Sequence, residues 1–356
     1  MRGILFDGQA LVFDDRIEVR EPGQGEVLVR MLASGICHSD LNVVDGFNRR
    51  PAPIILGHEG AGEVLRCGAG VAGLAPGDRV VIATITPCRN CHACTRGRLS
   101  DCRDAFGTGE RPFTVGGVPA LRYGNSSTWA EHVVVQATQL FPIGDLPTAG
   151  ASLIGCAVST GYGCVHNVAG VEAGDTVAVI GIGGIGANVL QTARLMGATR
   201  IIAIDVNPER RDAALHFGAT DVIIAGRDDD LVTAVRDLSG GGVDHAFECA
   251  GLVPTIEAAI TMTGPGGSAI LIGMPPRGAR ATFDVDDLFR GRRIVGSLNG
   301  ACDPARDFPA IIEHVRAGRL DIDALVTEVF PITRWADAIA ATRAGHMVRS
   351  VLDFTA

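Results

Sequence analysis

Residues 176–198 read TVAVIGIGGIGANVLQTARLMGA, and this stretch decides the fold that we expect. Its first part, TVAVIGI, is a continuous apolar run of the kind found in strands buried on both faces of a parallel sheet. The following ANVLQTARLMGA is typical of a helix that stops near Gly197. A glycine turn between a buried strand and a helix is the start of an α/β unit.

The same alternation continues along the chain after this stretch. We expect helices from near Pro208, from about Asp228 and from Pro254. The apolar runs that alternate with them predict strands, namely RIIAID (200–205), VIIA (222–225), VDHAFECA (243–250) and SAILIG (268–273). Repeated strand and helix predict a doubly wound parallel sheet.

The glycines at 181, 183 and 186 have the spacing GxGxxG. Gly181 permits a tight turn, Gly183 lets the backbone approach a pyrophosphate at the helix N-terminus, and Gly186 permits close packing of helix on strand. We expect Gly184, inside the same loop, to contact the ligand as well. The motif alone is weak, and a glycine turn that binds nothing is the alternative.

An acidic residue strengthens the dinucleotide interpretation. Asp205 ends the next predicted strand, 19 positions after Gly186, where a carboxylate binds the ribose hydroxyls of NAD. Its charge repels the extra phosphate of NADP, so we expect NAD. Arg210, an expected cofactor contact, and Arg211 follow closely and leave NADP open.

The first ~150 residues have a different pattern, consistent with about two domains in 356 residues. Short apolar runs bounded by turn residues predict a mainly β domain: GEVLVRMLA (25–33), AGEVLR (61–66) and DRVVIA (78–83). After about residue 298 the pattern weakens, but MVRSVLDF (347–354) resembles another strand.

Charge and hydropathy exclude several classes of protein. The net charge of −9 and the lack of a dense basic cluster argue against nucleic acid and anionic membranes as partners. No apolar run reaches the ~18–20 residues of a membrane helix, and the N-terminus does not resemble a secretory signal. We therefore expect a cytoplasmic protein.

Four of the ten cysteines lie within fifteen residues, in CRNCHACTRGRLSDC (88–102). Cys88, Cys91, Cys94 and Cys102 can surround one tetrahedral zinc ion, and a site closed by four thiolates is structural. Nearby arginines would offset its negative charge: Arg89, Arg96, Arg98 and Arg103. An iron–sulfur cluster has compatible spacing, whereas a redox CxxC motif needs only two cysteines.

Three separated residues are candidates for a second metal. Cys37, His58 and Cys156 supply two thiols and an imidazole, which with an open fourth position describe a catalytic zinc. Their spacing does not prove that they converge. Residue type alone leaves open a buried core thiol at Cys156 and a turn residue at His58.

These motifs occur together and in order. GICHSD (35–40), GHE, the four-cysteine loop, GCAVSTGYG, GIGGIG, IIAID, FECAG and MVRSVLDF resemble zinc-containing medium-chain alcohol dehydrogenases over nearly the whole chain. The resemblance implies a GroES-like, mainly β catalytic domain of residues 1–156 with 299–356 and an NAD-binding Rossmann domain of residues 157–298. It also implies that Cys37, His58 and Cys156 bind the catalytic zinc.

The resemblance further implies roles near the reacting groups. Ser39 would hydrogen-bond the substrate oxygen, and Asp40 would orient His58, a common arrangement around metal ligands. Glu59 would lie behind the metal and Thr160 near the nicotinamide. Ile85 and Trp129 occupy positions that resemble pocket-lining ones.

His38 and Arg349 would contact the cofactor's pyrophosphate by the same resemblance. One residue departs from the family pattern. Several members relay the alcohol proton to a histidine three residues after the Ser or Thr, and this chain has Asn42 there. An amide does not take up a proton at neutral pH, so the relay ends in water or at another group.

We therefore expect reversible oxidation of an alcohol to an aldehyde or ketone, with NAD and two zinc ions per chain. A dehydrogenase of a formaldehyde–thiol adduct, of the glutathione or mycothiol type, is the alternative enzyme. A non-catalytic zinc-stabilised binding protein and a thiol redox protein are further alternatives. Family members are usually dimers or tetramers, so we expect a homo-oligomer and a small-molecule substrate.

Overall fold

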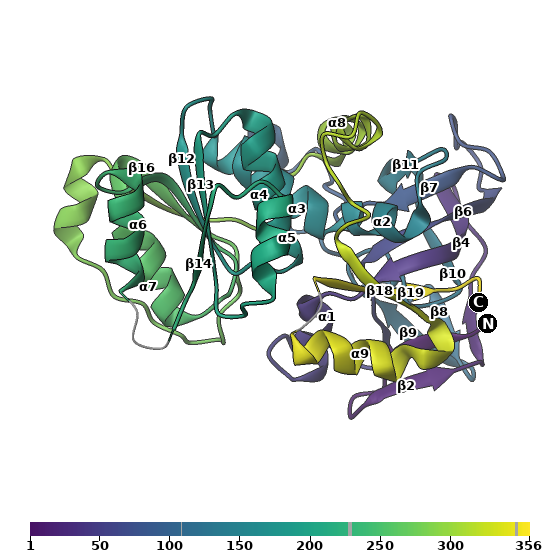
Figure 1. The fold of residues 1–356 in the computed structure, drawn as a ribbon. Helices are drawn as coiled ribbons and strands as arrows, with labels where there is room; N and C mark the ends of the chain where they lie inside the picture. The colour runs from purple at the N-terminus through teal and green to yellow at the C-terminus, as the bar shows by residue number, and fades with distance from the viewer. Residues whose placement is uncertain (108, 227–229, 346–347) are drawn as a thin grey trace. The chain divides into compact units, whose positions relative to one another are not determined.

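The computed structural model describes residues 1–107, 109–226, 230–345 and 348–356, which form two compact units (Figure 1). The first unit consists of Met1–Ala157, Asp303–Arg316 and Ile322–Ala356, and the second of Val158–Cys302 and Ala317–Asp321. Residues 299–302 and 317–321 thus group with the second unit. The domain boundaries implied by the resemblance stay a prediction.

The second unit contains one parallel sheet, with strand order β14-β13-β12-β15-β16-β17. Its strands are β12 (Thr176–Ile180), β13 (Arg200–Asp205), β14 (Asp221–Ile224), β15 (Val243–Glu248), β16 (Thr263–Leu271) and β17 (Arg293–Gly296). The order reverses between β12 and β15, and open α/β sheets bind ligands in the crevice at such a reversal. The predicted doubly wound sheet is confirmed.

Helices alternate with these strands. They are α3 (Ala157–Gly163), the π-helix η5 (Cys164–Ala169), α4 (Gly184–Met196), α5 (Arg210–His216), α6 (Leu231–Ser239), α7 (Val253–Met262), and the short 3-10 helices η6 (Val285–Arg290) and η7 (Asn299–Ala301). As predicted, α4 ends at Gly197, which has a φ of 88°. The helix expected from Pro208 begins two residues later, and the start expected near Asp228 lies outside the described residues.

The first unit is built on two sheets that are mainly antiparallel. One has the order β2-β1-β5-β9-β8-β3, and the other β11-β7-β6-β4-β19-β18 with β10 also paired to β4. The strands of the first sheet are β1 (Gly3–Phe6), β2 (Leu11–Asp14), β3 (Ile17–Val19), β5 (Ile54–Ile55), β8 (Phe113–Val115) and β9 (Val118–Arg122). Those of the second are β4 (Glu26–Gly35), β6 (Glu59–Cys67), β7 (Arg79–Ile82), β10 (His132–Gln136), β11 (Leu140–Pro142), β18 (Val326–Pro331) and β19 (Arg349–Asp353).

Strand β19, from the C-terminal segment, pairs with β4 from the N-terminal segment. The first unit therefore contains strands from both ends of the chain. The helices of this unit are α1 (His38–Val44), α2 (Thr148–Ser152), α8 (Pro304–Arg316) and α9 (Trp335–Ala344), with 3-10 turns η1 (Cys94–Arg96), η2 (Leu99–Asp101), η3 (Ala137–Gln139), η4 (Leu153–Gly155) and η8 (Ile332–Arg334).

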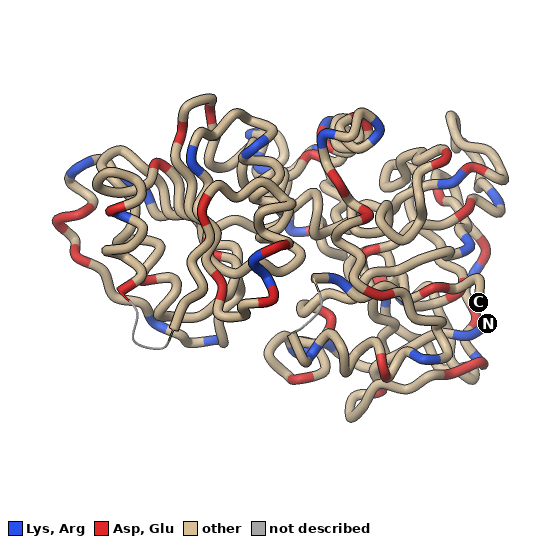
Figure 2. Tube along the Cα trace, in the orientation of Figure 1, with Lys and Arg blue, Asp and Glu red and all other residues tan. Residues whose placement is uncertain are grey.

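Side chains from both sheets share one buried cluster, which includes Ile4, Val29, Ile82 and Leu352. Trp129, expected to line a pocket, belongs to this core: it is 0% exposed and its indole N–H donates to Gly35 O at 3.3 Å. None of the described helices combines the length and apolar character that crossing a bilayer requires. Acidic and basic residues are interspersed over both units (Figure 2).

Candidate active site and metal centres

Two neighbouring strands bring the predicted catalytic ligands together. Cys37 follows β4 and caps α1, and His58 directly precedes β6, which pairs antiparallel with β4. Cys156 follows the turn η4. One ligand atom from each residue lies within 4.8 Å of those from the other two. Sequence separations of 21 and 98 residues thus end in one cluster of two thiols and an imidazole.

Glycines allow the backbone to come this close. Gly57, next to His58, has a φ of 86°, and a Cβ there would overlap the Trp129 indole. A Cβ on Gly155 would lie 2.8 Å from Ile82 O. Larger residues at either position would push the ligand segments apart.

Asp40 holds two of the ligand segments from α1. Its carboxylate is 0% exposed. Its Oδ1 accepts from His58 Nδ1 at 3.1 Å and from the Gly57 N–H at 2.9 Å, and its Oδ2 accepts from the Cys37 N–H at 3.3 Å. A hydrogen bond at Nδ1 makes Nε2 the ring nitrogen of His58 that can bind a metal, which is the arrangement expected for a ligand histidine.

The Ser39 hydroxyl lies beside the cluster, 3.2 Å from His58 Nε2. Tyr123, which the sequence did not single out, holds this part of α1 in place. Its hydroxyl donates to Ser39 O at 3.1 Å, and its ring meets the His58 ring edge-on at 5.6 Å between centroids. No spacing pattern could have revealed it, because it directly follows β9, in a part of the sequence that has no motif.

Glu59 and Arg349 lie buried behind Cys37. Glu59 is 0% exposed, its Oε1 accepts from the Ala157 N–H at 3.1 Å, and Arg349 Nη2 lies 3.5 Å from the same oxygen. Glu59 Oε2 and Arg349 Nε are buried without a hydrogen-bond partner. Burial raises the pKa of Glu59 to about 7 despite the nearby Arg349. In this structure Arg349 thus faces a carboxylate, and its predicted contact with a pyrophosphate stays a prediction.

The three candidate ligands perturb one another's protonation. A hydrogen bond from the Cys156 thiol and the charge of Arg349 lower the pKa of Cys37 well below its usual value. The same hydrogen bond, with burial, raises the pKa of Cys156. Burial lowers the pKa of His58, but the negative charge of Asp40 and its hydrogen bond to His58 outweigh burial and raise that pKa. Such a crowded, electron-rich donor set suits a dication, which replaces the bound protons.

The four cysteines of the 88–102 segment also converge, with ligand atoms within 4.8 Å of one another. The backbone folds around them, because the Cys88 N–H donates to Cys102 Sγ at 3.4 Å and Thr95 N–H to Cys91 O at 3.0 Å. Hydrogen bonds from the Cys94 N–H and from neighbouring thiols lower the pKa of Cys91 to about 7. Four thiols in this arrangement fit a closed zinc site.

Three of the four arginines expected to offset this charge have carboxylate partners. Arg89 Nη2 lies 2.6 Å from Asp303 Oδ1, and Arg98 lies 3.6 Å from Asp101. Arg103 likewise lies 3.5 Å from Asp104. Part of the positive charge that was expected to offset the thiolates is therefore compensated by these carboxylates.

In the second unit, the glycine motif joins β12 to α4 as predicted: residues 181–183 connect the two elements, and residues 184–186 begin α4. Gly181 has a φ of 89°, and a Cβ on Gly186 would overlap Gly181 O, so both glycines are required by the fold itself. Gly183, the cap of α4, has a φ of −87° and open space around a hypothetical Cβ. Because neither the backbone nor packing requires glycine at 183, the space there fits a group from outside the chain.

Asp205 lies at the end of β13, beside this loop. Its Oδ2 accepts from the Ile182 N–H at 2.7 Å and its Oδ1 from the Asn207 N–H at 2.9 Å. Arg210 is buried, and burial lowers its pKa although Asp205 opposes the effect. The carboxylate is thus held where a ribose of a dinucleotide is expected.

Two further predicted residues are not tested by these contacts. Thr160, in α3, is buried, and its hydroxyl accepts from Asn299 Nδ2 at 3.5 Å. His38, the first residue of α1, is exposed. Their predicted contacts with the cofactor stay predictions.

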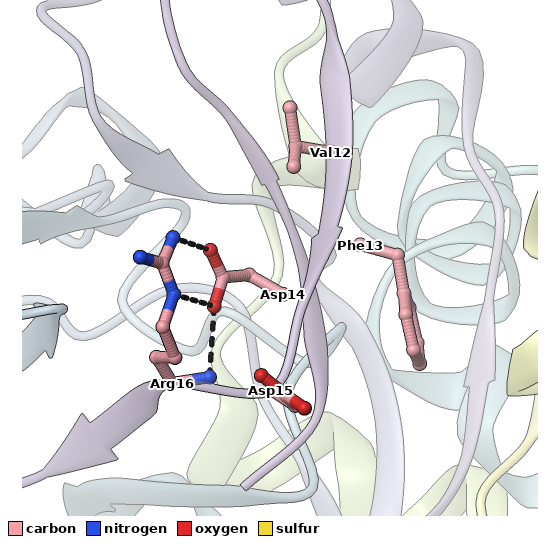
Figure 3. A pocket seen from close by; sticks show the side chains of 5 residues that line it. All are labelled: Val12, Phe13, Asp14, Asp15 and Arg16. Atoms are coloured by element: carbon pink, nitrogen blue, oxygen red, sulfur yellow. Dashed lines mark hydrogen bonds and ion pairs between the residues drawn. The ribbon is translucent and has the colours of Figure 1, made fainter.

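One surface pocket lies far from these residues in the sequence and contains none of them (Figure 3). It is lined by Val12, Phe13, Asp14, Asp15 and Arg16. Arg16 donates to both carboxylate oxygens of Asp14, at 3.1 and 2.6 Å, and this hydrogen bonding lowers the pKa of Asp14. Since Asp14 and Arg16 satisfy each other and none of the predicted site residues lines the pocket, we assign it no role in the reaction.

Comparison with known proteins agrees with the geometry. The model of the alcohol dehydrogenase GroES-like domain matches residues 23–145, and that of the zinc-binding dehydrogenase domain matches residues 184–317. S-(hydroxymethyl)glutathione dehydrogenase of Escherichia coli O157:H7 is 36% identical in an alignment of 352 residues that covers 95% of each chain. This chain belongs to the zinc-containing alcohol dehydrogenase family.

Solved structures of the zinc-containing alcohol dehydrogenase family have the same fold. The alcohol dehydrogenase zinc-binding domain protein of Burkholderia ambifaria has a TM-score of 0.93 and 31% identity, covering 99% of this chain and 98% of that one. Benzyl alcohol dehydrogenase of Acinetobacter calcoaceticus has a TM-score of 0.91 and 28% identity with the same coverage.

Family membership confirms the predicted GroES-like and Rossmann fold classes and the oxidoreductase class of the enzyme. It also supports zinc and a nicotinamide dinucleotide as cofactors. The two cysteine-containing clusters fit a structural and a catalytic zinc ion.

Proposed function

We propose that this chain catalyses the reversible oxidation of a small alcohol to an aldehyde or ketone, with NAD as the hydride acceptor. The observation that carries the proposal is the cluster of Cys37, His58 and Cys156 with the Ser39 hydroxyl 3.2 Å from His58 Nε2. Three protein donors leave one position open on a tetrahedral ion, which is the arrangement of catalytic zinc sites.

A zinc ion held there acts as a Lewis acid that lowers the pKa of an alcohol hydroxyl. The chain's own residues do the rest of the work on the proton. Ser39 lies next to the ligand histidine and accepts the alcohol proton through a hydrogen bond, and Asp40 keeps His58 oriented from its other ring nitrogen. Buried Glu59 and Arg349 lie beside the cluster, with Arg349 Nη2 3.5 Å from Glu59 Oε1.

The proton's route beyond Ser39 differs from that of family members with a histidine in the relay. Asn42 lies one turn further along α1 and is partly buried. Because its amide does not titrate near neutral pH, we propose that Ser39 passes the proton to water.

Asp205 supports NAD rather than NADP. Its carboxylate is held by two backbone N–H groups beside the glycine loop, so it cannot easily turn away from an added phosphate. Like charges in such proximity cost enough to disfavour NADP by about tenfold or more.

The test is to assay the zinc-loaded protein with primary, secondary and aromatic alcohols and with NAD or NADP. We expect reduced cofactor to form, faster with NAD, and Cys37→Ser to abolish it. The matched control is Cys67→Ser, since Cys67 lies outside both clusters. No reduced cofactor with any alcohol, or full activity of Cys37→Ser, would contradict the proposal.

A second candidate is the oxidation of a formaldehyde–thiol adduct, favoured by the name of the relatives that are 36% identical. Formaldehyde oxidation with and without glutathione separates the two candidates. A rate that requires the thiol and exceeds the rate with every simple alcohol supports the second. The homodimeric or homotetrameric state, the cytoplasmic location and the absence of nucleic-acid and membrane partners stay predictions.

A further inference from the structure

The four-cysteine loop has a narrow neck inside the first unit. Thr86 lies two residues before Cys88, and Ala105 lies three residues after Cys102. The Thr86 N–H donates to Ala105 O at 2.9 Å, and the Ala105 N–H donates to Cys102 O at 3.0 Å. The two ends of the loop are thus joined directly.

One side chain from outside the loop closes this neck. The amide Nδ2 of Asn125 donates to Ala105 O at 2.8 Å and also to the Thr86 hydroxyl. Asn125 is 4% exposed, so these hydrogen bonds form away from bulk water. A buried amide that bridges both ends of a loop resists their separation, because its donors would otherwise lose their partners.

The backbone of Asn125 is held as firmly as its side chain. Its φ of 57° is left-handed, a conformation that Asn tolerates better than most residues. Gln139 Nε2 donates to Asn125 O at 3.3 Å and to Ala83 O at 2.8 Å. Asn125 therefore has little freedom to move without moving its neighbours in the chain.

Those neighbours contact the candidate catalytic site. Tyr123 donates to Ser39 O at 3.1 Å and packs on the His58 ring. A Cβ on Gly124 would lie 3.0 Å from His58 Cβ, so this backbone lies directly against the ligand histidine. The Thr128 N–H donates to Gly57 O at 2.9 Å, next to His58. The segment 123–128 thus lies between the neck and the catalytic ligands.

We propose that Asn125 is a positioning residue that ties the four-cysteine loop to the catalytic site. By closing the neck it retains the loop's zinc, and by fixing segment 123–128 it aligns Ser39 and His58. The proposal rests on the proposed alcohol dehydrogenase function for its catalytic part, whereas its metal-retention part does not depend on activity.

Asn125→Gly is the informative variant, because glycine keeps the left-handed backbone and removes only the amide. In a Cys156→Ser background, where zinc is expected only in the four-cysteine loop, we expect Asn125→Gly to speed zinc transfer to a chelating dye by about tenfold. In the otherwise unchanged chain, we expect kcat for the alcohol to fall by about tenfold while KM for NAD stays within about twofold.

Ser126→Ala is the matched control. Ser126 is 0% exposed and belongs to the same segment, but its hydroxyl donates locally, to Gly124 O at 3.1 Å. We expect it to change neither zinc release nor kcat. If the segment only supported the fold, Asn125→Gly and Ser126→Ala would instead have the same effect on kcat and on KM.

Unchanged zinc release in Asn125→Gly overturns the neck assignment, and unchanged kcat overturns the link to the catalytic site. If Asn125→Gly does not fold, Thr86→Val takes its place, because it removes one acceptor of the Asn125 amide. We then expect faster zinc release and a lower kcat, both by a smaller amount than for Asn125→Gly. If either quantity stays unchanged, the proposal fails. A wild-type chain that oxidises no alcohol refutes the proposed function, and zinc release then still decides the role of Asn125 in the neck.

Discussion

Asp40 offers the sharpest quantitative prediction. Its carboxylate is fully buried and accepts hydrogen bonds from His58 Nδ1 and from the Gly57 and Cys37 N–H groups. Asp40→Ala removes all three acceptors and leaves buried donors unpaired, at about 1–3 kcal/mol each. Loss of a residue that orients a metal ligand typically weakens metal affinity by 10–100-fold, about 1.4–2.7 kcal/mol. We expect the loss of zinc affinity in Asp40→Ala to lie near the upper end of this range.

Asp40→Asn separates charge from geometry. The amide oxygen can keep the bonds to His58 and Gly57, which share Oδ1, while the amide NH2 replaces Oδ2 and faces the Cys37 N–H. The variant loses one long hydrogen bond and the charge assistance at His58. We expect about tenfold weaker zinc binding, the lower end of the range for such residues.

The assay is competition between the protein and a chelator for zinc, followed by kcat/KM with the best alcohol at saturating zinc. Asp45→Asn is the control, because Asp45 caps the other end of α1 and pairs at the surface with Arg343, 2.7 Å away. If Asp40→Ala binds zinc as tightly as the wild type does, Asp40 does not orient His58 and the reasoning is refuted.

Four other outcomes follow from the same structure. Asn42→His introduces a titratable group into the relay, so kcat should become dependent on pH near the histidine pKa of ~6.5. An unchanged pH profile of kcat shows that this position does not carry the proton. Gly183→Ala should weaken NAD binding without lowering Tm, because there is space for the added Cβ. Gly186→Ala should instead lower Tm, because its Cβ would overlap the preceding turn. Equal effects of the two variants on Tm would contradict this distinction. Cys88→Ser should reduce the zinc content from two ions to one and lower Tm; retention of both ions by metal analysis would argue against the four-cysteine site. Burial raises the pKa of Glu59 from 4.5 to about 7, so this carboxyl of the folded metal-free protein keeps a proton that the unfolded chain releases. The free energy of unfolding should therefore fall as the pH rises from about 4.5 to 7. Denaturant titrations should show a smaller fall in Glu59→Gln, and an identical fall would contradict the shift.

Local patterns predicted the parts of the fold that local physics determines. The strand, glycine turn and helix of residues 176–198 lie next to one another in the chain, so their periodicity was visible in the sequence. The four cysteines of the loop likewise lie within fifteen residues, and their spacing already implied a shared ion. Both predictions needed no knowledge of tertiary contacts.

The catalytic cluster could not be predicted in this way. Cys37 and His58 meet because β4 pairs with β6, and that register is set by the whole sheet. Residue types alone left the convergence of Cys156 open, and the family resemblance was needed to suggest it. The sequence contains no sign that the Tyr123 hydroxyl would reach Ser39 O, since the two residues are 84 positions apart.

Polar residues without a motif were also missed. Asn125 has no recognisable spacing to either cysteine group, and only its left-handed backbone and buried amide reveal its position at the neck. Arg349 is a related case: the family resemblance implied a cofactor contact, which stays a prediction, and its burial beside Glu59 was not visible in the sequence. Burial and pairing of this kind depend on contacts between distant segments.

The most direct test of the central claim is the rate of NADH formation from alcohol by Cys156→Ser, with zinc measured on the same sample. The claim is that Cys37, His58 and Cys156 hold the catalytic ion, separately from the four-cysteine loop. We predict two zinc ions per chain and turnover in the wild type, and one zinc ion and no turnover in the variant. Full turnover by a variant with one zinc ion would contradict the account.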